Sequence, residues 1–189
     1  MQVENAVQNR RSIRKFQNKP IPCEVLNRIV ELGRLYASGG NFQPVRFAIV
    51  SKAPALQEIF HTLRWAMYLP DYAVTEDDQP QAYIVLLRDN EVSKKCDFDI
   101  GAAATTIMLL AQEQGIGSCC LASFSASEVE KILRVKDNLS AELVIALGYG
   151  AHSSRIEPYT DTQKYRLDDN GNFVVPKRTI EDILVYTDI

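Results

Sequence analysis

The feature that most constrains the fold is the helical segment 97–114, whose middle is apolar nearly all round. Its apolar run, AAATTIMLLA at residues 102–111, is one of the longest in the chain. Such a run is too short to cross a bilayer, which takes about 20 apolar residues. A helix that is apolar all round is packed on every side. The sequence therefore predicts a helix inside the protein body, and no membrane partner is expected.

Further patterns predict strands and helices around this segment. VRFAIV at 45–50 predicts a strand, and the continuous apolar runs AYIVLLR at 82–88 and ELVIALG at 142–148 predict buried strands. GSCCLA at 117–122 predicts a shorter one. Helices are expected at 1–9, from Pro22 to about Ala37, at 53–64 and at 127–134. This alternation indicates an α/β or α+β sandwich with a central sheet covered by helices.

The chain has 189 residues, within the usual size range for one domain. Residues 66–80 are expected to form a long surface excursion. From residue 151 the chain is polar, and an irregular segment is expected until VVPKRTIEDILVY. That tail holds too few apolar residues to build its own core. We therefore expect a single domain over 1–189, in which 150–189 wrap over this subunit or a partner.

Charge and cysteine usage argue against several classes of protein. The formal net charge is −3 and the pI is about 5.5, which argues against a nucleic-acid binder. The cysteines form neither a CxxC nor a zinc-ligand spacing, and His61 and His152 lie far apart, so no metal site is expected. Small buried cysteines in a reducing compartment fit best. The N-terminus lacks the apolar stretch of a signal peptide, so a cytoplasmic protein is expected. The cysteines are Cys23, Cys96, Cys119 and Cys120.

The first candidate binding motif is the basic segment RRSIR at residues 10–14. Guanidinium groups present fixed donor forks to a phosphate or carboxylate. In an extended segment Arg10, Ser12 and Arg14 would share one face, while Arg11 would point away from it. That face would suit a phosphorylated cofactor. A solvated basic patch, a contact with an acidic partner, and a nuclear-localisation or nucleic-acid segment remain open alternatives.

The second candidate is the loop SGGNFQP at residues 38–44, between a helix end and a strand. Its two glycines allow the backbone to approach a planar ligand closely. Asn41 and Gln43 each carry donor and acceptor atoms, which suits the mixed polar edge of such a ligand. A helix end followed by a turn would explain the glycines, but not both amides.

Two further segments are weaker signals. GIGSCCLAS at 115–123 is not a GxGxxG motif and follows a helix, which disfavours a Rossmann site. Ala122 and Ser123 could still present backbone amides to a ligand. Lys177 and Arg178 could complete a phosphate site or form a charged surface turn. The chain has no GxSxG elbow, P-loop, Cys/His pairing or carboxylate pair, and chemistry delegated to a cofactor would need none of these.

Taken in order, RRSIRKF, NFQP, DIGAAATTIMLLAQEQGIGSC and VPKRTIEDIL resemble segments of the nitroreductase-like flavin enzymes, over nearly the whole chain. The resemblance implies an α+β fold with a central mixed, mainly antiparallel sheet flanked by helices. It also implies an intertwined homodimer with two FMN sites at the interface.

The resemblance also assigns site residues. Arg10, Ser12 and Arg14 would bind the phosphate, ribityl chain and pyrimidine edge, and the loop 38–43 would reach the flavin mostly from the opposite subunit. Backbone at Ala122 and Ser123 would lie near N5, and no side chain is expected to be catalytic. The expected cofactor-binding set is Arg10, Arg11, Ser12, Arg14, Ser38, Gly39, Asn41, Gln43, Leu121, Ala122, Ser123, Lys177 and Arg178.

The implied activity is hydride transfer from NAD(P)H, through the flavin, to a nitroaromatic, quinone or similar small acceptor. A dehalogenase, a dehydrogenase or a flavin-consuming enzyme could share the scaffold. A non-catalytic protein that binds anions or nucleic acid is the alternative from another class. Three positions depart from common family patterns: Arg14 is lysine in some relatives, Ala122-Ser123 replaces Gly-Gly or Glu-Gly, and Val45 stands where tryptophan is common.

Overall fold

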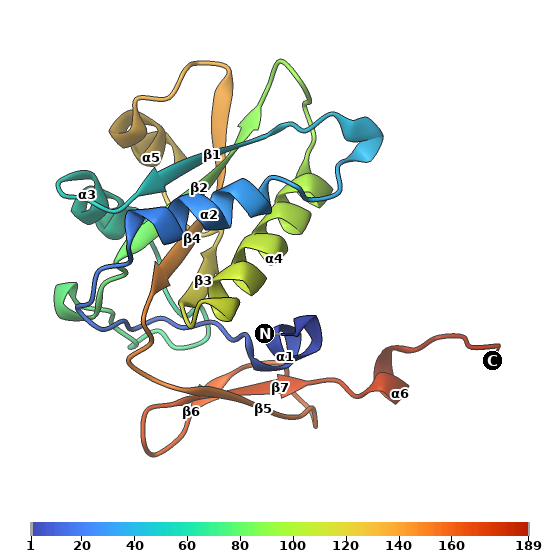
Figure 1. Cartoon of the computed structure of the whole chain (residues 1–189). Helices are drawn as coiled ribbons and strands as arrows, with labels where there is room; N and C mark the ends of the chain where they lie inside the picture. The colour runs from blue at the N-terminus through green and yellow to red at the C-terminus, as the bar shows by residue number, and fades with distance from the viewer. Residues whose placement is uncertain (1, 189) are drawn as a thin grey trace.

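The computed structural model describes residues 2–188, and its centre is a four-stranded sheet (Figure 1). The strand order is β1-β2-β4-β3, and each neighbouring pair is antiparallel. The strands are β1 (Val45–Val50), β2 (Ala82–Asp89), β3 (Gly117–Leu121) and β4 (Leu139–Gly148). The expected α+β class with a mainly antiparallel sheet is confirmed.

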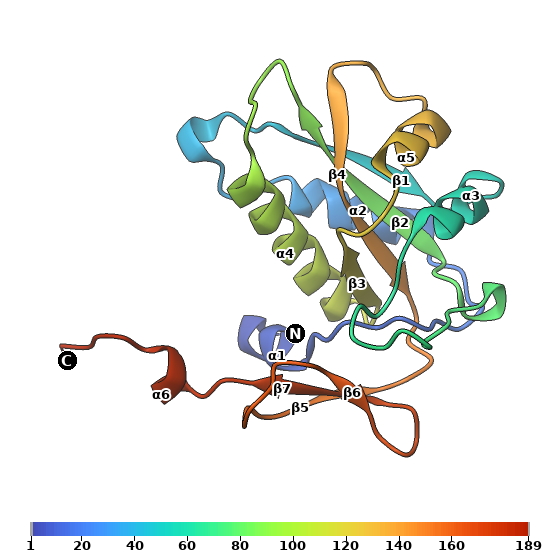
Figure 2. The ribbon, with the colours of Figure 1, turned by 180° about the vertical axis from the view of Figure 1, so that it is seen from behind.

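Helices cover both faces of this sheet (Figures 1 and 2). The helices α2 (Cys23–Gly33) and α4 (Asp97–Glu113) lie on one face, and α3 (Ala55–Thr62) and α5 (Ala126–Leu133) on the other. Successive side chains of a strand point to opposite faces. Accordingly Ile84 and Leu86 pack towards α2 and α4, whereas Tyr83 and Val85 pack towards α3 and α5. This double burial explains why β2 is an unbroken apolar run.

The expectation that helix 97–114 is packed on every side is wrong for the single chain. Ala103, Ala104 and Ile107 of α4 are buried against the sheet and α2. The opposite side of α4 is open, because Phe98 is 95 % exposed and Thr105 is also exposed. The sequence pattern cannot distinguish burial within one chain from burial against a second one.

The C-terminal tail is more regular than expected. It forms a second sheet in the order β5-β7-β6, with β5 parallel and β6 antiparallel to β7. These strands are β5 (Ser154–Pro158), β6 (Arg166–Leu167) and β7 (Phe173–Lys177). Phe173 and Val174 are fully buried, so the tail is held by a small apolar centre that it shares with the rest of the chain.

The small sheet lies beside α1 (Val3–Asn9), away from the central sheet (Figures 1 and 2). Beyond it the chain leaves the body as an arm, residues 178–188, which carries the short helix α6 (Ile180–Ile183). Two 3-10 turns complete the fold, η1 (Gly39–Asn41) and η2 (Glu76–Asp78). The arm exposes large apolar side chains, which are Ile180, Ile183, Leu184, Val185 and Tyr186.

Helix α2 ends at Gly33, short of the expected Ala37, where it crosses α4 closely. A Cβ atom at position 33 would lie 2.7 Å from Cγ1 of Ile107. We expect Gly33→Ala to lower the free energy of unfolding by about 1–3 kcal/mol, because overpacking forces the two helices apart. Urea denaturation measures this change.

Asn27→Ala is the matched control, because Asn27 is an exposed residue of the same helix. That control should change the free energy of unfolding by less than about 0.5 kcal/mol. Equal values for both variants would contradict the close helix crossing.

Candidate functional site

The basic segment RRSIR (residues 10–14) lies along β3, the edge strand of the central sheet. The Ile13 N–H donates to the Ser118 carbonyl at 2.9 Å, and Ser12 forms a parallel bridge with Ser118. Because the bridge is parallel, the segment runs in the same direction as β3, towards Leu121. The buried Ser118 hydroxyl has no hydrogen-bond partner in residues 2–188. The Ser118 hydroxyl, which can both donate and accept a hydrogen bond, is therefore still available beside Ser12.

Arg11 folds back onto the end of α1. Its guanidinium donates to the carbonyls of Gln8 at 2.6 Å and Arg10 at 2.5 Å. These carbonyls end α1, where a positive charge is favourable. Burial, and then the charge of Arg10, lower the pKa of Arg11. Arg11 therefore fixes the end of α1, whereas within residues 2–188 the side chains of Arg10 and Ser12 form no such hydrogen bond.

Arg14 is the buried cation of the segment, with 9 % of its surface exposed. Its guanidinium carbon lies 4.4 Å from the ring centroid of Phe173 and 4.7 Å from that of Tyr165. Its side-chain hydrogen bond is a long one, 3.5 Å to the Ser12 carbonyl. Within residues 2–188 no carboxylate forms an ion pair with it. Burying a charge without an anionic partner costs free energy of folding unless a ligand pairs with that charge.

His152 holds the main chain at the same residue. The Arg14 N–H donates to His152 Nε2 at 2.8 Å, and His152 Nδ1 lies 2.9 Å from the Ser153 carbonyl. Nε2 is therefore an acceptor and Nδ1 carries the proton, which is the neutral form of the ring. Burial lowers the pKa of His152, and the nearby charges of Arg14 and Lys15 act in the same direction.

The end of β3 opens to solvent. Leu121 is buried, but Ala122 and Ser123 are exposed, and the Ser123 carbonyl accepts from the Arg64 N–H at 3.0 Å. Ala122 and Ser123 line a hollow of about 400 Å³ together with residues 61–64. The fold thus brings the basic segment and the end of β3 to one side of the sheet.

The loop SGGNFQP (residues 38–44) is clamped to α4. The Ser38 hydroxyl donates to Asp99 Oδ1 at 2.5 Å and accepts from the Gln43 N–H at 2.9 Å. The φ angles of Gly40, Asn41 and Gln43 are 54°, 56° and 50°, the left-handed region that non-glycine residues rarely adopt. Asn41 and Gln43 are exposed, so a strained backbone displays two amide side chains.

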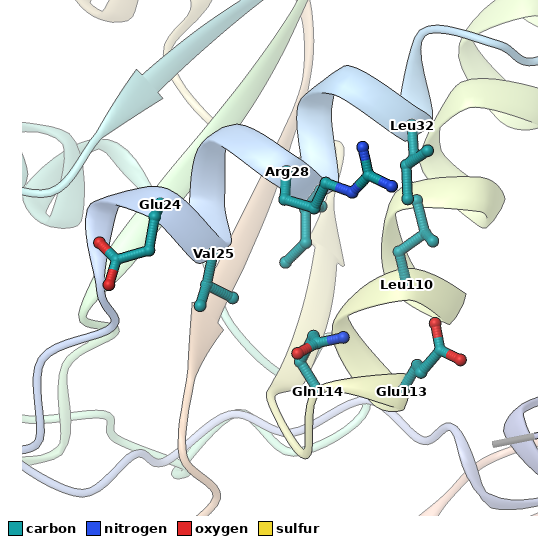
Figure 3. A pocket seen from close by; sticks show the side chains of 8 residues that line it. Glu24, Val25, Arg28, Leu32, Leu110, Glu113 and Gln114 are labelled. Atoms are coloured by element: carbon teal, nitrogen blue, oxygen red, sulfur yellow. The ribbon is translucent and has the colours of Figure 1, made fainter.

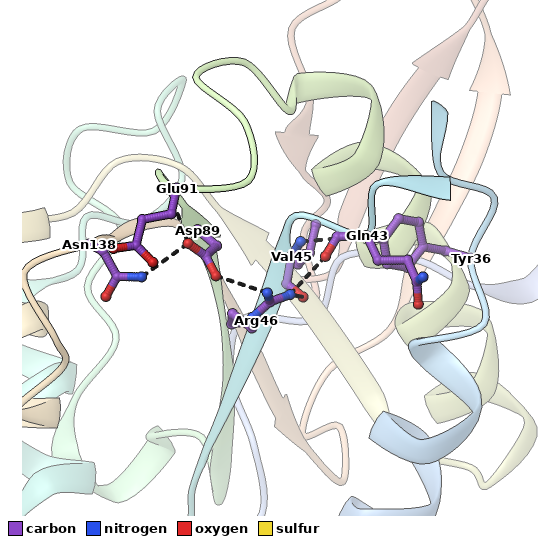
Figure 4. A network of polar contacts seen from close by, with 7 residues as sticks. All are labelled: Tyr36, Gln43, Val45, Arg46, Asp89, Glu91 and Asn138. Atoms are coloured by element: carbon purple, nitrogen blue, oxygen red, sulfur yellow. Dashed lines mark hydrogen bonds and ion pairs between the residues drawn. The ribbon is translucent and has the colours of Figure 1, made fainter. Parts of the chain in front are cut away.

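A polar network fixes the other end of this loop (Figure 4). Arg46 Nη1 donates to the Gln43 carbonyl at 2.7 Å, and Arg46 Nη2 lies 2.8 Å from Asp89 Oδ2. Asn138 donates to the other oxygen of Asp89 at 3.0 Å. Burial raises the pKa of Asp89, but the hydrogen bonds from the Glu91 N–H and Asn138 and the charge and hydrogen bond of Arg46 outweigh burial, so that the pKa is lowered. The loop is therefore held at Gln43 by Arg46 of β1, which Asp89 at the end of β2 holds in turn.

The two candidate regions lie at opposite ends of α4 within the chain (Figures 1 and 2). Asp99, which holds Ser38, is in the first turn of α4, and Ser118, which holds Ile13, follows its last turn. A helix of 17 residues is about 25 Å long. One flavin ring cannot contact both regions of the same chain.

Lys177 and Arg178 lie at the end of β7, beside α1. The Arg178 guanidinium stacks on Tyr159, 4.2 Å from the ring centroid. Lys177 lines a hollow of about 760 Å³ with Arg11 and Arg155. This end of the tail is strongly basic, and it adjoins the basic segment through α1.

The prediction of small buried cysteines holds for two of the four. Cys96 and Cys119 are buried as expected, but Cys23 and Cys120 are exposed, and none of the four is in a disulfide. In residues 2–188, no group of His, Cys, Asp and Glu side chains could hold a metal ion. The helices within 2–188 are too short or too polar to span a membrane.

Sequence reasoning missed Tyr165, Phe173 and His152 as partners of Arg14. They lie in a tail whose overall polarity suggested an irregular segment. The aromatic residues of that tail were the signal that could have indicated a packed element.

A family model described as the nitroreductase family matches residues 7–149. The chain belongs to the nitroreductase family. A protein of Archaeoglobus fulgidus, provisionally named NADH dehydrogenase/NAD(P)H nitroreductase, is 29 % identical over 88 % of this chain and 91 % of its own. A Parabacteroides distasonis structure with the same provisional name is 25 % identical, with a TM-score of 0.69 over 86 % of this chain and 94 % of its own.

A Desulfovibrio desulfuricans structure, provisionally described as a nitroreductase in complex with FMN, is 26 % identical. Its TM-score is 0.69, over 84 % of this chain and 92 % of its own. The family resemblance recognised in the sequence motifs is thus confirmed, together with the nitroreductase fold.

The lowered pKa of His152 predicts how the stability of this nitroreductase-family chain depends on pH. The unfolded chain takes up the His152 proton near the ordinary value of about 6.5, whereas the folded chain resists it. The stability that the neutral ring contributes is therefore complete above about pH 6.5 and is lost as the pH falls towards the lowered value. Urea denaturation between about pH 7.5 and about pH 5.5 should show this loss.

His152→Gln keeps an acceptor for Arg14 but cannot be protonated, so its stability should vary less over the same range. His61→Gln is the matched control, because His61 is exposed. A control that flattens the pH dependence as much as His152→Gln does would refute the assignment.

Proposed function

We propose that this chain is an FMN-dependent oxidoreductase that transfers hydride from NAD(P)H to a nitroaromatic, quinone or similar small acceptor. The observation that carries the proposal is Arg14, a buried cation that has no anionic partner among residues 2–188 and lies beside the exposed end of β3. The FMN complex of the Desulfovibrio desulfuricans structure supports FMN as the cofactor, and the names of the relatives support NAD(P)H as the hydride donor.

The residues present fit FMN. In the described part of the chain, the Ser118 hydroxyl has no hydrogen-bond partner and the Arg14 guanidinium has no ion-pair partner, so both can still bind a polar ligand beside the basic segment. Arg10 and Ser12 would bind the phosphate and the ribityl chain, and Arg14 the pyrimidine edge. Lys177 and Arg178 would add charge at the phosphate, and Arg11 would hold Arg10 in place. Bound FMN would supply an N5 atom that accepts and donates hydride.

Ala122 and Ser123 would contribute backbone, and no catalytic side chain is proposed. Both residues are small and exposed at the end of β3, so they leave a stacking face open to the nicotinamide. A backbone N–H fixed by the strand can polarise N5 without reorganisation. The contact between the Ser123 carbonyl and Arg64 helps to hold this backbone.

We also propose a homodimer in which the loop 38–44 of one subunit completes the site of the other. The length of α4 separates this loop from Arg14 of its own chain. The open side of α4 at Phe98 and the apolar side chains of the arm 178–188 are surfaces that a second copy would bury. Residues 150–189 would then be the wrapping extension of a single domain.

The groove between α2 and α4 is not the proposed site (Figure 3). It measures about 390 Å³, and Leu32 and Leu110 face each other across it. None of the candidate cofactor residues lines it.

Cofactor analysis tests the proposed function. The purified protein should be yellow, and heat should release FMN in a ratio of about one per chain. Anaerobic NAD(P)H should bleach the bound flavin, and a quinone or nitroaromatic should restore its colour. FAD in place of FMN, or no flavin after reconstitution, would contradict the proposal, as would a bound flavin that NAD(P)H leaves oxidised.

Light scattering tests the proposed dimer. The protein should have about twice the 21.3 kDa mass of one chain. Phe98→Lys should dissociate it and release FMN, because the charge would be buried at the interface. Ile49→Lys, at an exposed position on β1, is the control and should keep both dimer and flavin. A monomer that retains one FMN per chain would rule out a shared site.

A further inference from the structure

We propose that Tyr165 and Phe173 are positioning residues that hold the Arg14 guanidinium towards the flavin in place of a carboxylate. This inference rests on the proposed FMN site. The pair is called the aromatic clamp below. It uses two residues of the C-terminal sheet region to place a cation of the N-terminal segment.

The geometry of the clamp is that of a desolvated cation–π contact. The guanidinium carbon lies 4.7 Å from the Tyr165 ring centroid and 4.4 Å from that of Phe173. The two rings are 5.7 Å apart and inclined at 58° to each other. Both distances are within the range of about 6 Å at which a cation is attracted to a ring, and burial strengthens that attraction.

A ring holds a cation without neutralising it. A guanidinium has five N–H donors, and Arg14 uses one of them in a long bond to the Ser12 carbonyl. A carboxylate would occupy these donors and cancel the charge that a ligand needs. The nearby Asp78 carboxylate is instead 2.9 Å from the ammonium group of Lys15. The clamp therefore leaves both charge and donors of Arg14 available to an anionic ring edge.

The clamp is itself braced by residues from other parts of the chain. Tyr68 packs on Tyr165 with ring centroids 5.1 Å apart, and Tyr72 packs on Phe173 at 5.2 Å. Both braces come from the surface excursion 66–80. His152 lies 5.1 Å from Phe173 and also accepts the Arg14 N–H. The tail and the excursion thus fix Arg14 at its main chain and at its guanidinium.

The test replaces Tyr165, which is only partly buried, so that the fold survives. Tyr165→Leu removes the ring, and Tyr165→Phe keeps it. With FMN bound, Tyr165→Leu should weaken binding of reduced relative to oxidised FMN about fivefold. For a two-electron couple this lowers the midpoint potential by about 20 mV. Tyr165→Phe should leave the potential unchanged.

A double-mutant cycle separates positioning from general damage. In an Arg14→Gln background, Tyr165→Leu should cause no further fall in potential, because the ring acts through the guanidinium. The cycle consists of the unaltered protein, Tyr165→Leu, Arg14→Gln and the double variant. Urea denaturation of these four proteins without FMN should show that the two substitutions do not change the free energy of unfolding additively.

Each failure has its own signature. No coupling in the apoprotein would overturn the clamp itself. Additive falls in potential with FMN bound would overturn the positioning role while the FMN site stands. A protein of unaltered sequence that binds no FMN would contradict the proposed function, and the flavin-directed role of the clamp with it.

Discussion

The burial of the Arg14 guanidinium, without a carboxylate partner among residues 2–188, is the constraint on which this structure depends. Arg14 joins the N-terminal segment to the C-terminal sheet region through Tyr165, Phe173 and His152. The excursion 66–80 packs on the same two rings through Tyr68 and Tyr72. A buried charge is tolerated only where its surroundings offset the loss of water. Two aromatic rings do this here, and the small sheet that carries Phe173 thereby becomes part of the site. The tail is thus a component of the proposed cofactor site, in addition to its proposed role as a wrapping extension.

A second constraint is the rigid spacing set by α4. The helix fixes the loop 38–44 at one end and, through the following strand, the basic segment at the other. Both regions are built to present polar groups, one by left-handed backbone at Asn41 and Gln43, the other by Arg14. Neither region can move towards the other without unfolding the sheet, and in the proposed homodimer a second copy would unite them. The open side of α4 at Phe98 is consistent with this arrangement.

The central sheet could be predicted from the sequence because its pattern is local. The apolar run 82–88 forms β2, and the run 142–148 forms most of β4, which begins earlier, at Leu139. The tail could not be predicted, because β5 and β6 are short, polar and stabilised by pairing with β7. The basic segment and the loop were recognisable as motifs, whereas the partners of Arg14 are about 150 residues away in the chain. The contacts of Ser38 and Arg11 likewise depend on tertiary neighbours, so their supporting roles could not be read from spacing.

A crystal structure of the protein with FMN would test the central claim most directly. The account predicts that the flavin ring lies between Arg14 and the Ala122-Ser123 backbone of one subunit and the loop 38–44 of a second copy. The Arg14 guanidinium should contact the pyrimidine edge while it remains on the Tyr165 and Phe173 rings. A flavin seated in the groove between α2 and α4, or an Arg14 that faces away from the ring, would contradict it.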